Sequence, residues 1–239
     1  MGATGGSGTR TVARILRRAG LYIGTNLNES NDAVEFGDYS DRWINRFTPF
    51  RDRGLPSDLE GEMLEELAAV LDRHLDPLRR EPRRWGWKEP RSIYLLPFFH
   101  HHLPELRFLH VVRDGRDMAL SSNQNQLRKH GAAVGVTNTE RGVPERSIAL
   151  WSWVNLEAAR FGSSVLGERY LRIRFEDLCR EPVAITAAML EFFGLHAAPA
   201  SLAEEIVPPP SLGRWRSADP ALVDRLLEIG AGALGELGY

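Results

Sequence analysis

The feature that most constrains the fold is a glycine-rich loop at the start of the chain. The first ten residues read Met-Gly-Ala-Thr-Gly-Gly-Ser-Gly-Thr-Arg, and a helical pattern over residues 11–19 follows directly. Gly5, Gly6 and Gly8 allow backbone conformations that other residues avoid, so consecutive N–H groups can converge on one oxyanion. A helix that begins there adds free N–H groups and the positive end of its dipole. The loop therefore predicts a phosphate or sulfate site.

The details of this loop separate it from the common nucleotide-binding motifs. If Gly8 is the last glycine of a Walker A motif, Thr9 stands where that motif needs lysine and Arg10 where it needs serine or threonine. The loop does not match GxGxxG either. Ser7 and Thr9 supply hydroxyl donors beside the glycines, which favours an anion site over the alternative of a flexible N-terminal tail.

Composition bounds the class of protein. The 239 residues are 43% hydrophobic and 26% charged, which predicts one globular domain over residues 1–239 with a large core. The net charge of −2 gives no overall attraction to nucleic acid, so an anion site must be a local concentration of positive groups. No apolar run approaches the roughly 20 residues of a membrane span. A single cysteine, Cys179, and no visible signal peptide predict a cytoplasmic location.

Lysine is rare in this chain. Of its 30 basic residues only Lys88 and Lys129 are lysines, and the others are arginines. A compact ammonium cannot be replaced by a planar guanidinium where a point charge is needed. The two lysine positions are therefore candidates for a specific electrostatic role.

The pattern along the chain alternates between helices and strands. Apolar spacing predicts strands at 84–88, 108–112 and 170–175, and a capping box of Ser57 and Glu60 opens one of the helices predicted at 57–74, 92–102, 147–165 and 184–193. This alternation predicts an α/β fold, a three-layer sandwich with a central parallel sheet flanked by helices and ligands at the carboxyl ends of its strands. Two stretches without a pattern, 131–142 and 208–217, are candidate lids.

The beginning of the chain is unusual for such a fold. A phosphate loop normally follows a buried strand, and only Met1 precedes Gly2. We expect a complete chain to have an apolar strand of about four to six residues there. The first strand is therefore interpreted as truncated or missing.

A second anion-binding pattern follows the strand at 108–112. Arg113 ends this strand, Gly115 allows the turn, and Ser121 lies two turns into the predicted helix, where its hydroxyl can face back toward Arg113. Two phosphate-type sites at strand ends suit a nucleotide with phosphates at two positions. The alternative is that Asp114 and Asp117 only cap the helix and pair with Arg116, which we expect of those two carboxylates in any case.

In combination these residues resemble the sulfotransferases that use 3′-phosphoadenosine 5′-phosphosulfate. Ser7-Gly8-Thr9 is similar to the core of their 5′-phosphosulfate loop, and Arg113 with Ser121 to their 3′-phosphate pair. Lys88 before Glu89-Pro90 is similar to the lysine after their second strand. Residues 172–178 resemble a later strand with its acidic turn, and residues 212–215 the loop that closes over the cofactor. The resemblance implies a sulfotransferase sandwich related to the P-loop kinases.

The resemblance also implies roles for individual residues. Lys88 is the implied catalytic lysine, and no metal is required. The implied cofactor-binding residues are Gly5, Gly6, Ser7, Gly8, Thr9, Arg10, Arg113, Ser121, Gly213, Arg214 and Trp215. The implied reaction moves a sulfuryl group to a hydroxyl or amine of a small-molecule or glycan acceptor, whose pocket we expect to be shaped by residues 27–56, including Trp43, Phe47 and Phe50, and by residues 131–142.

Two positions depart from the family pattern. The family usually has Lys or Arg before Ser-Gly-Thr, where this chain has Gly6, so Arg10 or Lys88 must supply that charge. The cytosolic branch has a catalytic histidine two residues after the lysine, and here that residue is Pro90. In other branches the base is a glutamate after the first helix, and Glu29 is the nearest match, with Asp32 second.

Three alternatives remain open at this level. A small-molecule kinase of P-loop ancestry is disfavoured by the missing Walker lysine. A nucleotide-bisphosphate binding protein without transfer activity is favoured by Gly6. The run His100-His101-His102 invites a metal site, but it lacks the i, i+4 spacing of a helical zinc pair, so we expect surface or helix-capping histidines.

Overall fold

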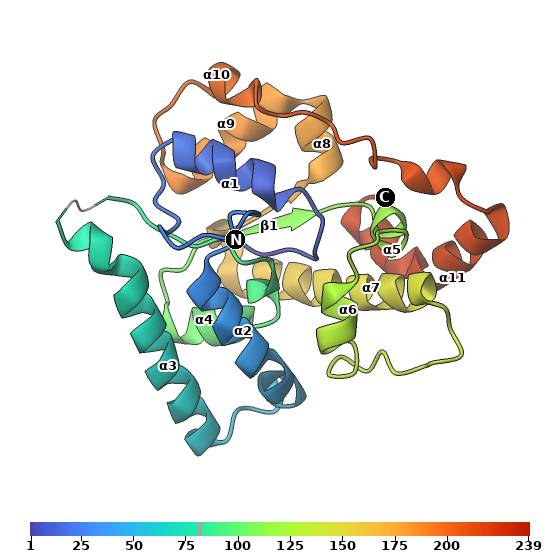
Figure 1. Ribbon diagram of the computed structural model, residues 1–239, viewed down its shortest axis with the longest axis horizontal. Helices are drawn as coiled ribbons and strands as arrows, with labels where there is room; N and C mark the ends of the chain where they lie inside the picture. Colours follow the sequence, from blue (N-terminus) through green and yellow to red (C-terminus); the bar gives the residue numbers. More distant parts are fainter. Residues whose placement is uncertain (81–82) are drawn as a thin grey trace.

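Two parallel strands lie at the centre of the molecule (Figure 1). The computed structural model describes residues 1–80 and 83–239. Strand β1 (Phe108–Val112) pairs with β2 (Tyr170–Arg174), with Phe108 opposite Tyr170 and Val112 opposite Arg174. All five residues of β1 are buried. Parallel strands need a long crossover, and here it contains three helices, α5 (Gly115–Ala119), α6 (Asn125–His130) and α7 (Val143–Phe161).

The N-terminal residues extend this parallel pairing. Gly2 bridges His110 in β1: the Gly2 N–H donates to the Leu109 carbonyl at 3.1 Å and its carbonyl accepts from the Val111 N–H at 3.2 Å. On the other side, the Ala3 N–H donates to the Pro90 carbonyl at 2.9 Å. A second parallel bridge joins Tyr22 to Trp85, within the stretch predicted to be extended. The glycine-rich loop therefore leaves the centre of the fold beside the end of β1.

Helices make up most of the remaining chain. The other α-helices are α1 (Thr9–Arg18), α2 (Val34–Phe47), α3 (Ser57–Leu75), α4 (Leu96–His102), α8 (Phe175–Arg180), α9 (Pro182–Phe193), α10 (Pro199–Ala203) and α11 (Pro220–Leu237). The short helical turns are η1 (Thr48–Phe50), η2 (Asp76–Arg79), η3 (Pro90–Ile93), the π-turn η4 (Gly162–Leu166), η5 (Gly167–Arg169) and η6 (Arg214–Ser217). No helix in the described ranges is long and apolar enough to cross a membrane.

Three groups of buried side chains hold these elements together. One joins α1 and α9 to the strands, with Ile15 and Met189 packed near Val111 and Ile173. The second joins α2, α3, α4 and α7 around Phe108, and the third joins α5, α7 and α11. In Figure 1, α1, α8, α9 and α10 lie on one side of β1 and α4 and α7 on the other. The molecule is thus a helix-rich α/β fold with a small parallel sheet, which agrees with the predicted α/β class.

Several predicted boundaries were wrong for local reasons. Ser57 is itself the first residue of α3, after Pro56, and no side chain caps that helix, so the capping box does not form. The helix predicted at 92–102 is split into η3 and α4, because Pro97 has no N–H to donate and therefore sits in the first turn of α4. The helix predicted at 147–165 begins earlier, at Val143, with Pro144 in its first turn, and changes at Gly162 to the π-turn.

Candidate active site

The glycine-rich loop has the backbone geometry that its sequence predicts. Gly6 and Gly8 have left-handed φ angles of 87° and 84°. At Gly8 space is also limiting, because an added Cβ would lie 2.2 Å from the ring of Phe175. Gly8 directly precedes α1, and no side chain caps the first turn of this helix. The helix therefore presents backbone N–H groups at its start, as an anion site requires.

The two hydroxyls of the loop have different surroundings. The Ser7 hydroxyl is buried and donates to the carbonyl of Thr4 at 2.8 Å, so it stabilises the loop itself. Thr9, at the first position of α1, lines a cavity in front of the loop. Thr9 therefore borders the cavity, whereas Ser7 does not line it.

We call the space in front of the loop the loop cavity. It has a volume of about 350 Å³, within the range of ligand pockets. It brings together residues that are far apart in the sequence, including Lys88 and Arg113. Its lining is Gly5, Gly6, Gly8, Thr9, Arg10, Thr11, Ser30, Asp32, Lys88, Pro90, Arg113, Asn123, Phe175, Val207 and Pro209.

Lys88 is the most deeply buried cation of this cavity. It is 1% exposed, it donates to the Ser30 carbonyl at 2.9 Å, and it forms an ion pair with Asp32. Burial lowers the pKa of the Lys88 ammonium below its usual value, and the carboxylates of Asp32 and Glu89 oppose that change. A desolvated point charge next to a glycine-rich loop can stabilise negative charge strongly, because little water screens it.

The two candidate bases lie in different positions. Asp32 lines the loop cavity beside Lys88, and Asn28 fixes it by donating to its Oδ2 at 3.0 Å and accepting from its backbone N–H at 2.9 Å. Glu29 is exposed and does not line the loop cavity. The structure therefore brings Asp32, rather than Glu29, next to Lys88.

Arg113 also reaches the loop cavity. Its guanidinium donates to the Gly6 carbonyl at 3.3 Å and to Asp117 Oδ2 at 3.0 Å. Its Nε is buried and has no hydrogen-bond partner among the described residues. Asp114 caps α5 and pairs with Arg116, as predicted. The same prediction was wrong for Asp117, which pairs with Arg113 because the two are one helical turn apart and both buried.

Ser121 does not have the predicted position. Helix α5 ends at Ala119 after five residues, so Ser121 lies in the loop beyond it rather than two turns into a helix. Its Oγ accepts from the N–H of Asn123 at 3.2 Å. Ser121 does not line the loop cavity, whereas Asn123, two residues later, does.

The segment 208–217 is attached to α5. The N–H groups of Gly213 and Trp215 donate to the Asp117 carboxylate at 2.6 and 3.2 Å, and Arg214 donates to the Leu120 carbonyl at 3.2 Å. The Arg116 guanidinium stacks on the Trp215 ring at 3.7 Å. Of this part of the chain, Pro209 lines the loop cavity and Gly213, Arg214 and Trp215 do not.

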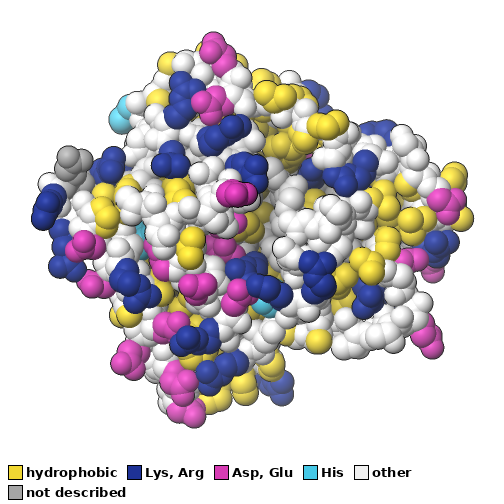
Figure 2. Space-filling model, in the orientation of Figure 1, with side chains coloured by type: hydrophobic (Ala, Val, Ile, Leu, Met, Phe, Trp, Pro, Cys, Tyr) yellow, Lys and Arg dark blue, Asp and Glu magenta, His cyan; other side chains and the backbone are white. Residues whose placement is uncertain are grey.

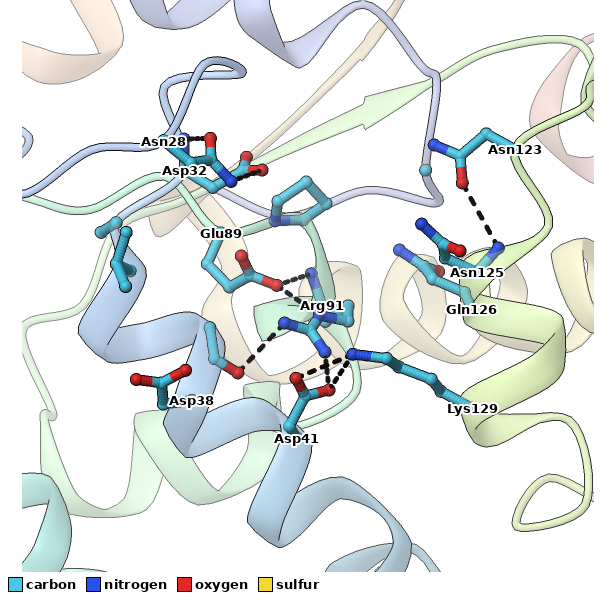
Figure 3. A pocket seen from close by; sticks show the side chains of 15 residues that line it. Asn28, Asp32, Asp38, Asp41, Glu89, Arg91, Asn123, Asn125, Gln126 and Lys129 are labelled. Carbon is cyan, nitrogen blue, oxygen red and sulfur yellow. Dashed lines mark hydrogen bonds and ion pairs between the residues drawn. The ribbon is translucent and has the colours of Figure 1, made fainter.

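A second cavity of about 390 Å³ opens next to the first (Figure 3). We call it the polar cavity. It shares Gly5, Asp32, Pro90 and Asn123 with the loop cavity. Its other lining residues come mainly from α2, η3 and α6: Asn28, Ala33, Val34, Gly37, Asp38, Asp41, Glu89, Arg91, Asn125, Gln126 and Lys129.

Charged groups in the polar cavity form a chain of ion pairs. Arg91 Nε donates to Glu89 Oε1 at 2.6 Å, and its other end pairs with Asp41. Lys129 Nζ donates to both oxygens of Asp41 at 2.8 Å (Figure 3). Burial raises the pKa of the Glu89 carboxyl above its usual value, and the Arg91 guanidinium opposes this. Asp38 has no ion-pair partner in the described part of the chain.

The sequence did not identify the polar cavity. It gave partial signals: Asp32 and Lys129 were singled out and line this cavity, and its lining residues from Asn28 to Asp41 fall within the segment 27–56 that was expected to shape an acceptor pocket. Of the aromatic residues expected to shape an acceptor pocket, Trp43 and Phe47 are buried in the core because they lie on the inner face of α2, and Phe50 is partly buried against the same core. No residue of 131–142 lines either cavity.

The three histidines lie elsewhere. His101 is exposed, and one ligand atom from each of Glu60, His101 and His102 lies within 4.8 Å of the others. Neither Glu60 nor any of the three histidines lines the loop cavity or the polar cavity. They play no part in the arrangement around Lys88.

A family model matches most of the chain. The sulfotransferase family model matches residues 7–199, which include the glycine-rich loop from Ser7 onward, Lys88, Arg113 and both strands. No curated protein matches the chain at a significant level. The match covers well over half of the 239 residues, and the chain therefore belongs to the sulfotransferase family.

Proposed function

We propose that the protein transfers a sulfuryl group from 3′-phosphoadenosine 5′-phosphosulfate to a hydroxyl or amine of a small-molecule or glycan acceptor in the cytoplasm. Membership of the family supports sulfotransfer. The choice of donor is supported by one observation: the glycine-rich loop, Lys88 and Arg113 line one cavity. A site with cations at separate points suits a nucleotide that is charged at both its 3′ and 5′ ends.

The residues of the loop cavity fit this donor. The loop from Gly5 to Thr9 offers backbone N–H groups for the 5′-phosphosulfate, and Arg10 offers a charge near the position where the family has Lys or Arg. The buried, unpartnered Nε of Arg113 supports a role in holding the 3′-phosphate. Ser121 and residues 213–215 would join only after a rearrangement of their loops. The bridges of Gly2 and Tyr22 support a P-loop-kinase-like, three-layer sandwich.

The donor supplies an activated sulfuryl group when it is bound. Lys88 neutralises the charge that grows on the oxygen between phosphate and sulfate, because its buried ammonium is a compact charge. Asp32 accepts the proton of the acceptor hydroxyl, since it lies on the boundary between the two cavities. Glu29 is the second candidate for this role.

Two measurements test this function. In a thermal-shift comparison, adenosine 3′,5′-bisphosphate should raise the melting temperature and ATP with Mg²⁺ should not, because only a ligand of the native site stabilises it. The opposite result would favour a small-molecule kinase. Transfer from a labelled donor then separates an enzyme from a binding protein, since a protein without activity would bind the bisphosphate and form no sulfated product.

A further inference from the structure

We infer that the polar cavity binds the acceptor, and that the acceptor is a small, hydroxyl-rich compound with a positive charge, of the amino sugar class. This inference rests on the proposed function of the loop cavity. It is carried by the position of the polar cavity, by the balance of charges that line it, and by one unpartnered carboxylate oxygen inside it.

The position of the polar cavity suits an acceptor. The two cavities meet at Gly5, Asp32, Pro90 and Asn123. A molecule in the polar cavity can therefore direct a hydroxyl toward Asp32, whose carboxylate pairs with Lys88 of the loop cavity. Holding both reactants on either side of one boundary is the main contribution that a site can make to a transfer reaction of this kind.

The charges that line the polar cavity favour a cation. Four carboxylates, those of Asp32, Asp38, Asp41 and Glu89, and two cations, Arg91 and Lys129, line this cavity. Asp32 pairs with Lys88 of the loop cavity, so among the described residues Asp38 is the lining carboxylate without an ion-pair partner. Both cations are already paired, Arg91 with Glu89 and Asp41 and Lys129 with Asp41. In Figure 2, Asp and Glu side chains are more frequent over the half of this face that α2 and α3 form. The loop cavity has the opposite character, with Arg10, Lys88 and Arg113 in its lining.

Glu89 provides an independent indication of a ligand. Its side chain is only 3% exposed, and both hydrogen bonds from Arg91 go to its Oε1. Oε2 accepts no hydrogen bond from any residue in the described ranges, although Glu89 lines the polar cavity. Oε2 is not among the fully buried atoms, so it remains accessible, and a donor group of a ligand in the cavity can reach it. An ammonium or hydroxyl group of a ligand would supply the missing donor.

The uncharged residues of the lining narrow the chemical class of the acceptor further. Asn123, Asn125 and Gln126 add amide groups, and the apolar residues of the lining are Ala33, Val34 and Pro90. No aromatic side chain is among the residues that line this cavity. Sugars and other polyols bind through such amide and carboxylate groups, whereas phenols and lipids need apolar or aromatic surface.

The chemical step balances with these groups. The acceptor hydroxyl oxygen forms a bond to sulfur, the bond between sulfur and the bridging oxygen breaks, and adenosine 3′,5′-bisphosphate leaves with that oxygen. The proton of the hydroxyl goes to Asp32. The ammonium group of the acceptor stays protonated near Asp38 and Glu89 and takes no part in bond formation.

The test uses three sugars of matched size: glucosamine, glucose and glucuronic acid, which are cationic, neutral and anionic at mildly acidic pH. Binding of each to the full chain, saturated with adenosine 3′,5′-bisphosphate, is followed by ligand-observed NMR. We expect glucosamine to bind best and glucuronic acid worst. Asp38→Asn removes one charge and keeps the shape, so it should weaken glucosamine binding roughly two- to fivefold. The control Asp224→Asn, at an exposed position on α11, should change nothing.

A second variant, Gly37→Ala, tests whether the sugar occupies the polar cavity without destabilising the fold. A Cβ at Gly37 would lie 3.4 Å from an Arg91 nitrogen and 3.8 Å from Glu89 Oε2, so it fills space without a clash. Alanine is also the better helix former, by roughly 1 kcal/mol. We expect this variant to be at least as stable as the wild type and to lose glucosamine binding.

The outcomes distinguish the inference from the proposed function. If adenosine 3′,5′-bisphosphate does not bind, the proposed function fails. If it binds while glucuronic acid or glucose binds as well as glucosamine, or no sugar binds, the inference is overturned and the function stands. Unchanged glucosamine binding in Gly37→Ala would also overturn it, because the sugar would then occupy another site.

Discussion

Arg113 and Asp117 form a buried ion pair, with Arg113 Nη2 donating to Asp117 Oδ2 at 3.0 Å. The same carboxylate accepts from the N–H groups of Gly213 and Trp215, and Arg113 also donates to Ser211. One pair of side chains therefore connects the end of β1 to the segment 208–217. A phosphate that binds Arg113 competes with these contacts, so its binding and the position of this segment are coupled.

The first prediction concerns the 3′-phosphate. Arg113→Ala should weaken adenosine 3′,5′-bisphosphate binding roughly ten- to hundredfold, because a charged hydrogen bond to phosphate contributes about 1.5–3 kcal/mol. Adenosine 5′-monophosphate, which lacks that phosphate, should bind almost unchanged. Calorimetry with both nucleotides is the measurement. Arg113→Lys keeps a positive charge beside Asp117 and serves as the control for folding. Equal losses of affinity for the two nucleotides in Arg113→Ala would exclude this role for Arg113.

The second prediction concerns the base. The sequence favoured Glu29, and the structure favours Asp32 because it lies beside Lys88 at the boundary of both cavities. Asp32→Asn should lower the rate of transfer roughly 10²–10⁴-fold. Glu29→Gln should stay near the wild-type rate. Both variants should bind adenosine 3′,5′-bisphosphate, and a reversed order of the two rates would assign the base to Glu29.

The third prediction concerns the loop backbone. Gly8 and Gly20 both have left-handed φ angles, of 84° and 95°, but an added Cβ meets Phe175 at 2.2 Å in the first case and no atom within 4 Å in the second. Gly20→Ala should therefore cost only the backbone strain, about 1 kcal/mol. Gly8→Ala should lower the free energy of unfolding by at least about 2 kcal/mol more and abolish bisphosphate binding. Equal stability of the two variants in urea titrations would contradict this.

The fourth prediction concerns acid stability. His110 is fully buried in β1 between Asn155 and Tyr170, and burial lowers its pKa to about 4. The unfolded chain then binds this proton more tightly than the folded one, so stability is present above about pH 6.5 and is lost as pH falls toward 4. His110 alone should cost about 1–2 kcal/mol between pH 7 and pH 5. An NMR titration of its ring with a midpoint near 6.5 would refute this.

Local patterns predicted the parts of the fold that depend on local interactions. Strand β1 and helix α3 were found from their apolar spacing, and the loop geometry from Gly6 and Gly8. The meeting of the loop, Lys88 and Arg113 also followed from sequence, since the carboxyl ends of parallel strands converge at one edge. All of these features depend on local sequence patterns and on the order of the motifs along the chain, and both can be read from the sequence.

The remaining features depend on tertiary contacts. Ser121 was misplaced because the sequence does not show that α5 ends at Ala119. The choice between Glu29 and Asp32 depends on the hydrogen bonds of Asn28, which turn one side chain inward. The polar cavity combines one face of α2 with residues of η3 and α6, and no short motif links residues so far apart.

The most direct test of the account is transfer of labelled sulfur. The wild type is incubated with 3′-phosphoadenosine 5′-phosphosulfate labelled at sulfur and a mixture of small hydroxyl compounds that includes amino sugars. We predict a labelled sulfated product and adenosine 3′,5′-bisphosphate in equal amounts, and a rate at least roughly 10²-fold lower for Lys88→Arg, because the guanidinium cannot place its charge on the bridging oxygen. A wild type that binds the bisphosphate yet never transfers the label, or a Lys88→Arg variant with unchanged turnover, would contradict the account.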